Sequence, residues 1–575
     1  MRNSFGSTEP DPGSRAEPDP RPRAAPEPGA GPGAGPGSGS GPGAGPGSGS
    51  GSEAGPGAGS GDGAVRGRRG AGLARSLLAV VLGALPVLAF PAPGLWWWAY
   101  VSLVPWLLLV RTAPSARRAA LDGWCGGIGF LLAMHHWLLP SVHVFLLVMA
   151  VLLGLLWLPW GVLVRALLGG APTPARAAAA LCAVPSGWLL IELVRSWEGL
   201  GGPWGLLGAS QWEVPAALRL ASVGGVWLVS LLVVAVNTAL VLLIAVPGLR
   251  AVGVAGLAAC ALVAGTAVWG VGAPRPSGSV RVAMVQPGVH GGTDGAERRL
   301  DRAEELTRGL AGQGLDLVVW GESGVARDPA ADPELTARLT ALARAVDAPL
   351  LVNVDARRED RPGIYKSALL FAPDGPTGDR YDKMRLVPFG EYVPARGLFG
   401  WATSVGKAAE EDRRRGTAPV VMRLPNGERP LTVGPLVCFE SAFPDMSRRL
   451  AGDGADVIVV QSATSTFQRS WAPAQHASLA ALRAAETGRP VVHATLTGVS
   501  AAYGPDGRRV GPPVGTDAST AVVRELPLSE STTVYARWGD WPLYGACVVI
   551  GAVAVAAGAG AARRTGFRRT GFRRT

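Results

Sequence analysis

Hydrophobic residues gather along this chain into long runs that contain almost no charge. Seven such runs follow one another in the first half of the chain, and an eighth lies near its end. Their approximate ranges are 76–92, 94–110, 121–139, 142–164, 177–194, 222–246, 251–271 and 541–562. A helix needs about 20 apolar residues to cross a bilayer. The pattern therefore predicts a polytopic α-helical membrane domain of about eight transmembrane helices.

Between the seventh and eighth runs the pattern changes to short β-branched segments that end near polar or Gly-rich residues. Seven strands are predicted, at 280–287, 315–322, 348–355, 365–373, 431–440, 456–463 and 489–496. Helix-like stretches lie between several of them, at 296–312, 332–346 and 474–488. Alternating strands and helices predict an α/β domain, whose reactive residues gather at the carboxyl ends of the strands.

Arginine placement predicts the orientation in the membrane. Arg-rich connections alternate with uncharged ones such as PAPG at 91–94 and LPSV at 139–142. By the positive-inside rule, both termini face the cytoplasm. Eight crossings then place residues 272–540 outside the cytoplasm and return the C-terminal tail inside. We therefore predict a multi-pass protein of the cell (plasma) membrane.

The predicted domains follow from these patterns and from composition. The N-terminal residues are rich in Pro, Gly, Ser and Ala, which cannot bury enough apolar surface to fold, so a disordered tail is expected. The order is a cytoplasmic tail at 1–63, seven transmembrane helices at 64–271, an extracytoplasmic catalytic domain at 272–535, a final transmembrane helix at 536–562 and a basic cytoplasmic tail at 563–575.

The net charge of +11 would suit a nucleic-acid partner. The arginines, however, gather in the connections between apolar runs and in the final RRTGFRRTGFRRT, where anionic lipid is the expected contact. No nucleic-acid partner is expected. Lysine occurs only at 366, 383 and 407, an Arg bias that is typical of high-GC bacterial genomes such as those of actinobacteria.

One of the five cysteines stands apart. Cys438 lies in GPLVCFES, a strand-like segment with polar neighbours, whereas the others lie in apolar runs. A thiol reacts as its thiolate, so it needs a base or a cation nearby. Glu322, at a strand end, is the candidate base, and the compact ammonium of Lys383 suits a single oxyanion. The cysteine spacing indicates no disulfide framework and no metal site, and no cofactor is expected.

These residues fall in motifs that resemble a known family. WGES at 320–323, RYDKMRLVPFGEYVP at 380–394 and VCFES at 437–441 follow the order of the Glu–Lys–Cys triad of the nitrilase (carbon-nitrogen hydrolase) superfamily. With WLLIELVRSWEGLGGPWGLLGASQW at 188–212 and TVYARWGDW at 533–541, the arrangement resembles the apolipoprotein N-acyltransferase family over about 70–562. The resemblance implies an αββα sandwich for the α/β domain.

The resemblance also implies a ping-pong acyl transfer without a cofactor. Glu322 would deprotonate Cys438, which would attack an acyl ester of a membrane phospholipid. Lys383 and the backbone N–H of Phe439 would hold the oxyanion. The α-amino group of the diacylglyceryl-cysteine of an apolipoprotein would then take the acyl chain from the thioester.

Further residues receive supporting positions from the same resemblance. Glu391 matches the family's second glutamate, which would orient Lys383 or the base, and Glu440 would support the cysteine turn. The loop RGLFGWATSVG at 396–406 is expected to be a lid or a membrane-dipping arm. Its predicted lipid-binding anchors are Leu398, Phe399 and Trp401.

Three stretches depart from the family pattern, and two other functions stay open. The departing stretches, expected to shape pocket walls and substrate selectivity, are PGVHGGTDG at 287–295, QSATSTF at 461–467 and ATLTGVS at 494–500. A membrane-tethered nitrilase-type amidase would act on a soluble amide and would need only one anchoring helix. A catalytically decayed homologue would bind or transport without reacting. We expect the protein to act as a monomer.

Overall fold

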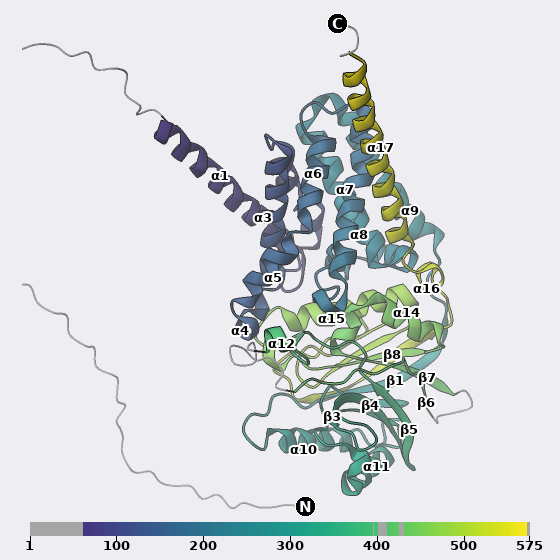
Figure 1. Ribbon diagram of the computed structural model, residues 1–575. Coiled ribbons are helices and arrows are strands. Elements are labelled where there is room, and N and C mark those ends of the chain that lie inside the picture. Colours follow the sequence, from purple (N-terminus) through teal and green to yellow (C-terminus); the bar gives the residue numbers. More distant parts are fainter. Residues whose placement is uncertain (1–60, 395, 401–410, 425–429, 572–575) are drawn as a thin grey trace, which may run out of the picture. The chain divides into compact units, whose positions relative to one another are not determined.

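The computed structural model describes residues 61–394, 396–400, 411–424 and 430–571. The tail predicted at 1–63 lies outside the described residues, apart from 61–63, which begin the first helix. Val65–Thr575 form one unit of contacts. Within it, a helical part precedes a β-rich part, and the last helix returns to the helical part (Figure 1).

The helical part contains the membrane-capable segments. Its main helices are α1 (Gly61–Ala84), α2 (Val104–Arg111), α3 (Ala116–Met134), α4 (Leu139–Val142), α5 (Phe145–Gly154), α6 (Trp157–Leu168), α7 (Pro174–Arg195), α8 (Pro215–Ala245), α9 (Arg250–Gly270) and α17 (Trp541–Gly571). Among the described residues, five helices are long and apolar enough to cross a membrane, or up to seven if each of two bent helix pairs is one span. The polytopic membrane part predicted from the apolar runs is therefore present.

Eight transmembrane helices were predicted, and the segment 94–110 accounts for the one that is missing from the seven possible spans. It is divided into the 3-10 helix η2 (Trp96–Tyr100) and α2. The eight residues of α2 extend about 12 Å at ~1.5 Å per residue, well short of the ~30 Å hydrocarbon core. Trp106 and Leu107 of α2 are fully buried, and the helix packs against α6 and α8.

The β-rich part is an αββα sandwich. One sheet has the strand order β11-β1-β2-β3-β4-β5 and the other β10-β9-β8-β7-β6. The strands are β1 (Pro276–Gln286), β2 (Leu317–Trp320), β3 (Leu350–Arg357), β4 (Ile364–Ala372), β5 (Gly375–Asp382), β6 (Met422–Leu424), β7 (Leu431–Val437), β8 (Val457–Ser462), β9 (Val491–Thr495), β10 (Ala501–Tyr503) and β11 (Thr520–Ser529). The covering helices are α10 (Gly295–Arg308), α11 (Pro333–Val346), α14 (Pro444–Gly452) and α15 (Ala472–Thr487). All seven predicted strands and the three predicted helices are confirmed.

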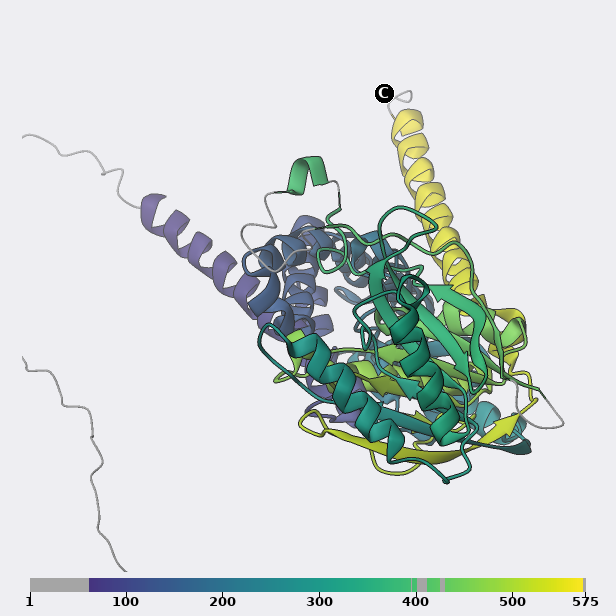
Figure 2. The ribbon, with the colours of Figure 1, turned by 90° about the horizontal axis from the view of Figure 1, so that it is seen from below.

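Alternation along the strands divides the sandwich core into layers, because successive side chains of a strand point to opposite faces. Val282 of β1 and Val459 of β8 belong to the apolar cluster between the two sheets. Their neighbours face outward: Ala283 packs in the cluster that includes α10 and α11, and Val460 in the cluster that includes α14 and α15. Figures 1 and 2 show α10 and α11 on the outer side of the six-stranded sheet.

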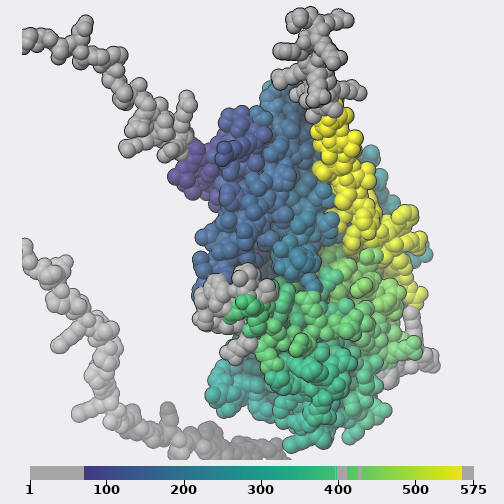
Figure 3. All heavy atoms as spheres, in the orientation of Figure 1, coloured from purple at the N-terminus to yellow at the C-terminus, as the bar shows by residue number. Residues whose placement is uncertain are grey.

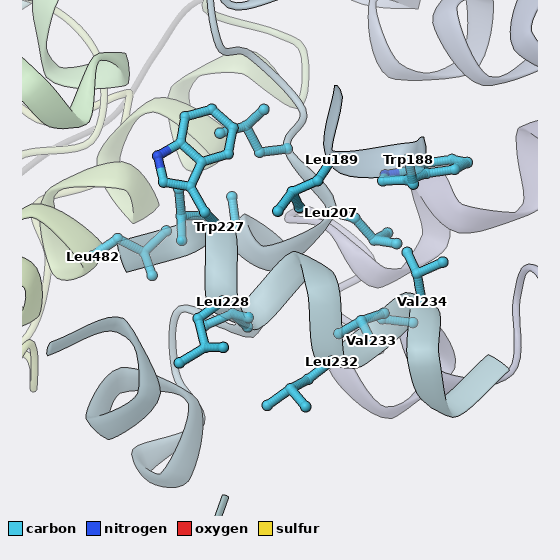
Figure 4. Close-up of a cluster of buried hydrophobic side chains, with 14 of the residues drawn as sticks. Trp188, Leu189, Leu207, Trp227, Leu228, Leu232, Val233, Val234 and Leu482 are labelled. Atoms are coloured by element: carbon cyan, nitrogen blue, oxygen red, sulfur yellow. The ribbon is translucent and has the colours of Figure 1, made fainter. Parts of the chain in front are cut away.

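Helix α15 joins the sandwich to the membrane part. All residues of α15 except the half-buried Ala474 are buried, since the helix packs between the five-stranded sheet and α8. A helix covered on every side has no polar face, which explains the alanine-rich sequence of α15. Leu482 of α15 lies in one continuous apolar cluster with Trp227 and Leu228 of α8 (Figure 4).

A second contact fixes the position of the two parts. α8 is interrupted at Gly224 and Gly225, and the Val226 N–H that starts its second half donates to Oε1 of Glu486 at 2.8 Å. A carboxylate at a helix N-terminus satisfies an otherwise unpaired N–H group. The final helix α17 packs along α7 and α8 (Figure 3).

Candidate active site

Cys438 begins a tight 3-10 turn, η8 (Cys438–Ala442), directly after strand β7. Its backbone φ is +51°, a left-handed conformation that a residue with a side chain rarely adopts. Such conformations persist where the surrounding structure enforces them and gather at functional sites. The strand-end position predicted for this thiol is therefore present, with a sharp turn at the cysteine itself.

Glu440 ties the cysteine turn to the segment that carries Lys383. Its Oε2 accepts the Val437 N–H at 2.8 Å. Its Oε1 accepts the N–H groups of Met384 at 2.7 Å and Arg385 at 3.0 Å, together with the Tyr381 hydroxyl at 2.7 Å. Burial raises the pKa of Glu440. One buried carboxylate thus holds two distant backbone segments at a fixed separation, a supporting contact of the kind predicted for it.

The structure brings the other predicted residues to the same place. Glu322 follows β2 and Lys383 follows β5, both in the six-stranded sheet, whereas Cys438 leaves the five-stranded sheet. The Lys383 Nζ lies 3.2 Å from Oε1 of Glu322 and 2.7 Å from Oε1 of Glu391. The Glu322 carboxylate lies close enough to the Cys438 thiol that its charge affects the pKa of the thiol. Segments more than 100 residues apart therefore meet between the two sheets.

Two of the departing residues hold the Glu322 loop. The Glu322 N–H donates to the carbonyl oxygen of Ser462 at 3.1 Å, and Gln461 Nε2 donates to the carbonyl oxygen of Trp320 at 2.9 Å. Both belong to QSATSTF. Further along the same run, Ala463, Thr464 and Phe467 line the cavity next to Cys438, as expected for a pocket wall. Residues of this run therefore both support the glutamate and line the pocket.

Lys366 is a site residue that the sequence analysis missed. It lies on β4 beside the end of β5, and its Nζ donates to Oε1 of Glu322 at 2.9 Å. The same nitrogen lies 3.2 Å from Oε1 of Glu391. The signal was available, because Lys366 is one of only three lysines in a chain that otherwise uses arginine. Both lysines of the described residues occupy this site.

Charge and burial set the resting protonation of the site. Burial disfavours the Glu322 carboxylate, but the ammonium groups of Lys366 and Lys383 outweigh that effect and hold the pKa of Glu322 well below its ordinary value. Burial and then the Glu322 charge raise the pKa of the Cys438 thiol. Near neutral pH the site therefore holds an ionised glutamate, two ammonium groups and a protonated thiol.

His476 lies behind the cysteine. Its Nε2 is 3.0 Å from the carbonyl oxygen of Cys438 and 3.0 Å from Oγ of Ser441, and its Nδ1 is 3.1 Å from Oγ of Ser462. Burial lowers the pKa of His476 to about 4, so the ring is neutral near pH 7. These contacts support the backbone of the cysteine turn, and the base beside the thiol is a carboxylate.

An apolar cavity of about 430 Å³ opens beside the thiol. Its wall combines the two parts of the molecule: Leu131 of α3 and Leu146 of α5 face it with Cys438 and Phe439. Arg195, at the end of α7, adds a buried guanidinium that donates to the carbonyl oxygens of Trp204 at 3.3 Å and Gly205 at 3.4 Å. The thiol of Cys438 therefore faces a largely apolar space.

Most of the predicted lid lies outside the residues that the structure describes. Residues 401–410, with Trp401, lie outside the described residues, and so do the side chains of Leu398 and Phe399. The backbone of 396–399 forms one short helix, α12 (Arg396–Phe399). Upstream of it, Val387 and Phe389 line the cavity. The lid function of this loop stays a prediction.

An αββα sandwich with this buried glutamate, lysine and cysteine places the chain in the carbon-nitrogen hydrolase class, and residues 281–535 match the family model described as carbon-nitrogen hydrolase. Residues 82–239 match the model described as apolipoprotein N-acyltransferase N-terminal domain. Among solved structures, Saccharomyces cerevisiae Nit3, a member of branch 10 of the nitrilase superfamily, is similar at 19% identity and a TM-score of 0.35, over 44% of this chain and 93% of that chain.

Curated relatives extend the similarity over both parts of the molecule. The apolipoprotein N-acyltransferase of Azotobacter vinelandii is 32% identical over 504 residues, covering 83% of this chain and 93% of the relative. That of Pseudomonas syringae pv. tomato is 30% identical over 496 residues, covering 83% and 95%. The chain belongs to the apolipoprotein N-acyltransferase family. It is a membrane acyltransferase of lipoprotein maturation.

Proposed function

We propose that Cys438 carries a fatty acyl chain as a thioester between a membrane phospholipid and the α-amino group of the N-terminal diacylglyceryl-cysteine of an apolipoprotein. The observation that carries this proposal is the position of the thiol, which interacts electrostatically with Glu322 and lines an apolar cavity of about 430 Å³. A soluble amide would need no such cavity. The relatives, which are apolipoprotein N-acyltransferases, indicate the acceptor class.

The first half of the reaction moves one proton and exchanges one bond. Glu322 takes the thiol proton while the sulfur of Cys438 attacks the ester carbonyl, and the carbonyl electron pair moves to the oxygen. Lys383, with the N–H of Phe439, stabilises this oxyanion. Collapse breaks the ester C–O bond, and the proton passes from Glu322 to the departing lysophospholipid alkoxide. A thioester on Cys438 remains.

The second half repeats these steps with the amine as nucleophile. The neutral α-amino group attacks the thioester carbonyl, Glu322 takes a proton from the nitrogen, and Lys383 again holds the oxyanion. The C–S bond then breaks, the thiol of Cys438 is restored with the proton from Glu322, and an amide is formed. Glu391 keeps the Lys383 ammonium in place, and Glu440 keeps the lysine segment against the cysteine turn.

We also propose the orientation predicted from the sequence, with the catalytic domain at 272–535 outside the cytoplasm, both termini inside, and 94–110 as a broken eighth crossing. Contacts between arginine-bearing loops support it. Arg111 donates to the carbonyl oxygen of Leu168, and Arg165 to that of Ala113, so these loops share one end of the bundle. At the other end of α3, the ring of His136 lies 4.6 Å from that of Trp471 in the catalytic part.

Acyl-enzyme trapping tests the proposed reaction. The purified full-length protein is incubated with a phospholipid that carries a radiolabel in its acyl chain, then denatured and resolved. We expect label on the protein that hydroxylamine releases, as thioesters require, and no label on Cys438→Ala. Added diacylglyceryl lipopeptide should discharge the wild-type label into an amide.

The matched control is Cys182→Ala, which removes an exposed thiol of α7 outside the site. It should accept label as the wild type does. Equal labelling of Cys438→Ala would overturn the assignment of the nucleophile. Hydrolysis of a soluble amide, without labelling and without lipopeptide acylation, would indicate a membrane-tethered amidase instead.

A further inference from the structure

Four charged groups form a closed ring next to the thiol. Lys366 Nζ lies 2.9 Å from Oε1 of Glu322 and 3.2 Å from Oε1 of Glu391. Lys383 Nζ lies 3.2 Å and 2.7 Å from the same two oxygens. Each ammonium therefore contacts both carboxylates, and signs alternate around the ring. The four side chains are between 0% and 13% exposed, so water screens these charges little.

The charge count of this ring depends on Lys366. With two ammonium groups and two carboxylates the resting ring is neutral. When Glu322 takes the thiol proton, the ring gains one positive charge, which matches the single negative charge of the oxyanion formed in the same step. Without Lys366 the ring would be negative at rest and only neutral beside the oxyanion. A buried uncompensated charge is strongly unfavourable.

We propose that Lys366 is a positioning residue of the acyl-transfer reaction, whose ammonium balances the second carboxylate and leaves Lys383 free to hold the oxyanion while Glu322 accepts the thiol proton. It acts through Glu322 and Glu391 and touches no substrate atom. This inference rests on the proposed thioester mechanism and extends it from three residues to a ring of four.

Every charged group around Lys366 is compatible with this role. Besides Glu322, Glu391 and Lys383, the carboxylate of Asp355 on the adjacent strand β3 lies 3.7 Å from its Nζ. Asp355 is itself paired with Arg413, whose Nε lies 3.2 Å from Oδ1 of Asp355. The Asp355–Arg413 pair is neutral by itself, so it leaves the net charge of the ring unchanged. Ser323 Oγ, at 3.3 Å, completes the contacts of the ammonium.

The experiment compares Lys366→Gln with Lys366→Arg, which keeps the charge. Rates of acyl-enzyme formation are measured against pH with the labelled phospholipid. An opposite charge within about 4–6 Å lowers a carboxyl pKa by roughly 1–3 units. Loss of the Lys366 charge should therefore raise the pKa of Glu322 and move the acid limb of the profile to higher pH by about 1 unit or more. The rate near pH 7 should fall at least about tenfold.

Lys366→Arg should return the acid limb to within about half a unit of the wild-type position, a rescue that a purely structural role of the side chain would not produce. A second readout covers folded variants that accept no acyl label: alkylation of Cys438 by iodoacetamide, followed on its peptide by mass spectrometry in samples with wild-type melting behaviour. The Lys366 charge favours the thiolate, so the midpoint of alkylation should rise in Lys366→Gln.

Two results would overturn the proposal: an acid limb that stays in place in a folded Lys366→Gln protein, or equal shifts in the Gln and Arg variants. Failure of the proposed function is distinguishable from both. If the wild type accepts no acyl label, the thioester mechanism is wrong. The alkylation midpoints then still decide whether Lys366 sets the charge balance around the thiol. Unchanged alkylation midpoints would rule out the proposed role of Lys366 in either case.

Discussion

Glu322 exerts two opposite effects on the thiol of Cys438. As a neighbouring negative charge it disfavours the thiolate, second only to burial among the causes that raise the pKa of Cys438. In the proposed reaction it is also the base that takes the thiol proton during attack. At rest the thiol is therefore protonated. In the proposed mechanism its reactivity depends on bound substrate, because proton transfer and carbon–sulfur bond formation occur together.

This dual effect predicts an inversion in Glu322→Gln. Removal of the charge should lower the pKa of Cys438, so that iodoacetamide alkylates the thiol faster at pH 8 than in the wild type. Acyl-enzyme formation should nevertheless fall by about 10²–10⁴-fold, the typical contribution of a general base. Both rates are measured on one preparation, the first by mass spectrometry of the Cys438 peptide and the second with labelled phospholipid.

The control for that inversion is Glu411→Gln, at a half-exposed glutamate that pairs with Arg357. It should leave both rates within about twofold of the wild type. Slower alkylation in Glu322→Gln would mean that the carboxylate promotes the thiolate at rest, contrary to the charge arrangement described above.

The direction in which pH changes the stability of the site follows from the same contacts. A carboxyl group whose folded pKa is depressed stabilises the native state above its ordinary pKa, and this contribution is lost as the pH falls through the folded value. Since both lysines depress the pKa of Glu322, its ion pairs persist below the ordinary glutamate value of about 4.3. The ring is thus maintained across the range in which most proteins function.

At this scale the sequence predicted four residues that the structure brings together, but not their electrostatics. Glu322, Lys383, Glu391 and Cys438 were recognised because each lies in a motif of the resembled family. Lys366 lies in YKSALLFAPDG at 365–375, which resembles the family's strand before the lysine, but that resemblance assigns no role to Lys366. Its role depends on distances across β4 and β5, which a linear sequence does not contain.

At the scale of elements, the loop between α7 and the 3-10 helix η5 (Leu207–Gln211) shapes the surroundings of Cys438. Gly202 in this loop has φ +72°, and a Cβ there would lie 2.5 Å from Cζ of Phe439 and 2.8 Å from Cζ of Phe443. The two rings pack edge to face, with centroids 5.0 Å apart. A glycine thus lets a loop of the membrane part approach the residue that follows the nucleophile.

We expect Gly202→Ala to impair acyl transfer by displacing these rings. Acyl-enzyme formation should fall at least about tenfold. Gly201→Ala is the matched control, because Gly201 also has a positive φ, +100°, but nothing lies within 4 Å of its Cβ position. Backbone strain of about 1–3 kcal/mol is common to both variants, so only Gly202→Ala adds a clash. Equal losses in the two variants would show that ring displacement does not matter.

Which strands could be predicted follows from their place in the sheets. The seven predicted strands are all interior, whereas β5, β6, β10 and β11, which were missed, are the four sheet edges. Interior strands are covered on both faces and become continuous apolar runs. Edge strands are short or polar. In β5, for example, GPTGDRYD has a single buried residue, Tyr381, so no apolar pattern marks it.

At the scale of the whole molecule, the cavity forms only where the helical part and the β-rich part pack together. Its wall needs α3, α5, the loop after α7 and the cysteine turn at once, and no segment alone carries a signature of it. The apolar runs predicted that membrane helices exist, and the strand pattern predicted the sandwich. Neither predicted that α15 would be buried between them. Docking of the two parts is what brings a lipid-sized space to the thiol.

The orientation of the assembly gives the last prediction. Single cysteines are introduced at two exposed positions of a variant whose five native cysteines are serine: Asp374→Cys, in the β4–β5 turn of the catalytic part, and Ala171→Cys, between α6 and α7. By the positive-inside rule, the α6–α7 loop beside Arg165 and Arg176 is expected to face the cytoplasm. In intact cells a membrane-impermeant maleimide should label Asp374→Cys only, and permeabilisation should expose Ala171→Cys.

That comparison decides where the reaction takes place, because the two positions belong to opposite ends of the helical bundle. The arginine-bearing loops share one end, and the catalytic part contacts the other through His136 and Trp471. A lipoprotein N-terminus can reach Cys438 only from the side on which the catalytic part lies. Labelling of Ala171→Cys in intact cells, with Asp374→Cys protected, would place the acyl acceptor in the cytoplasm and contradict the proposed orientation.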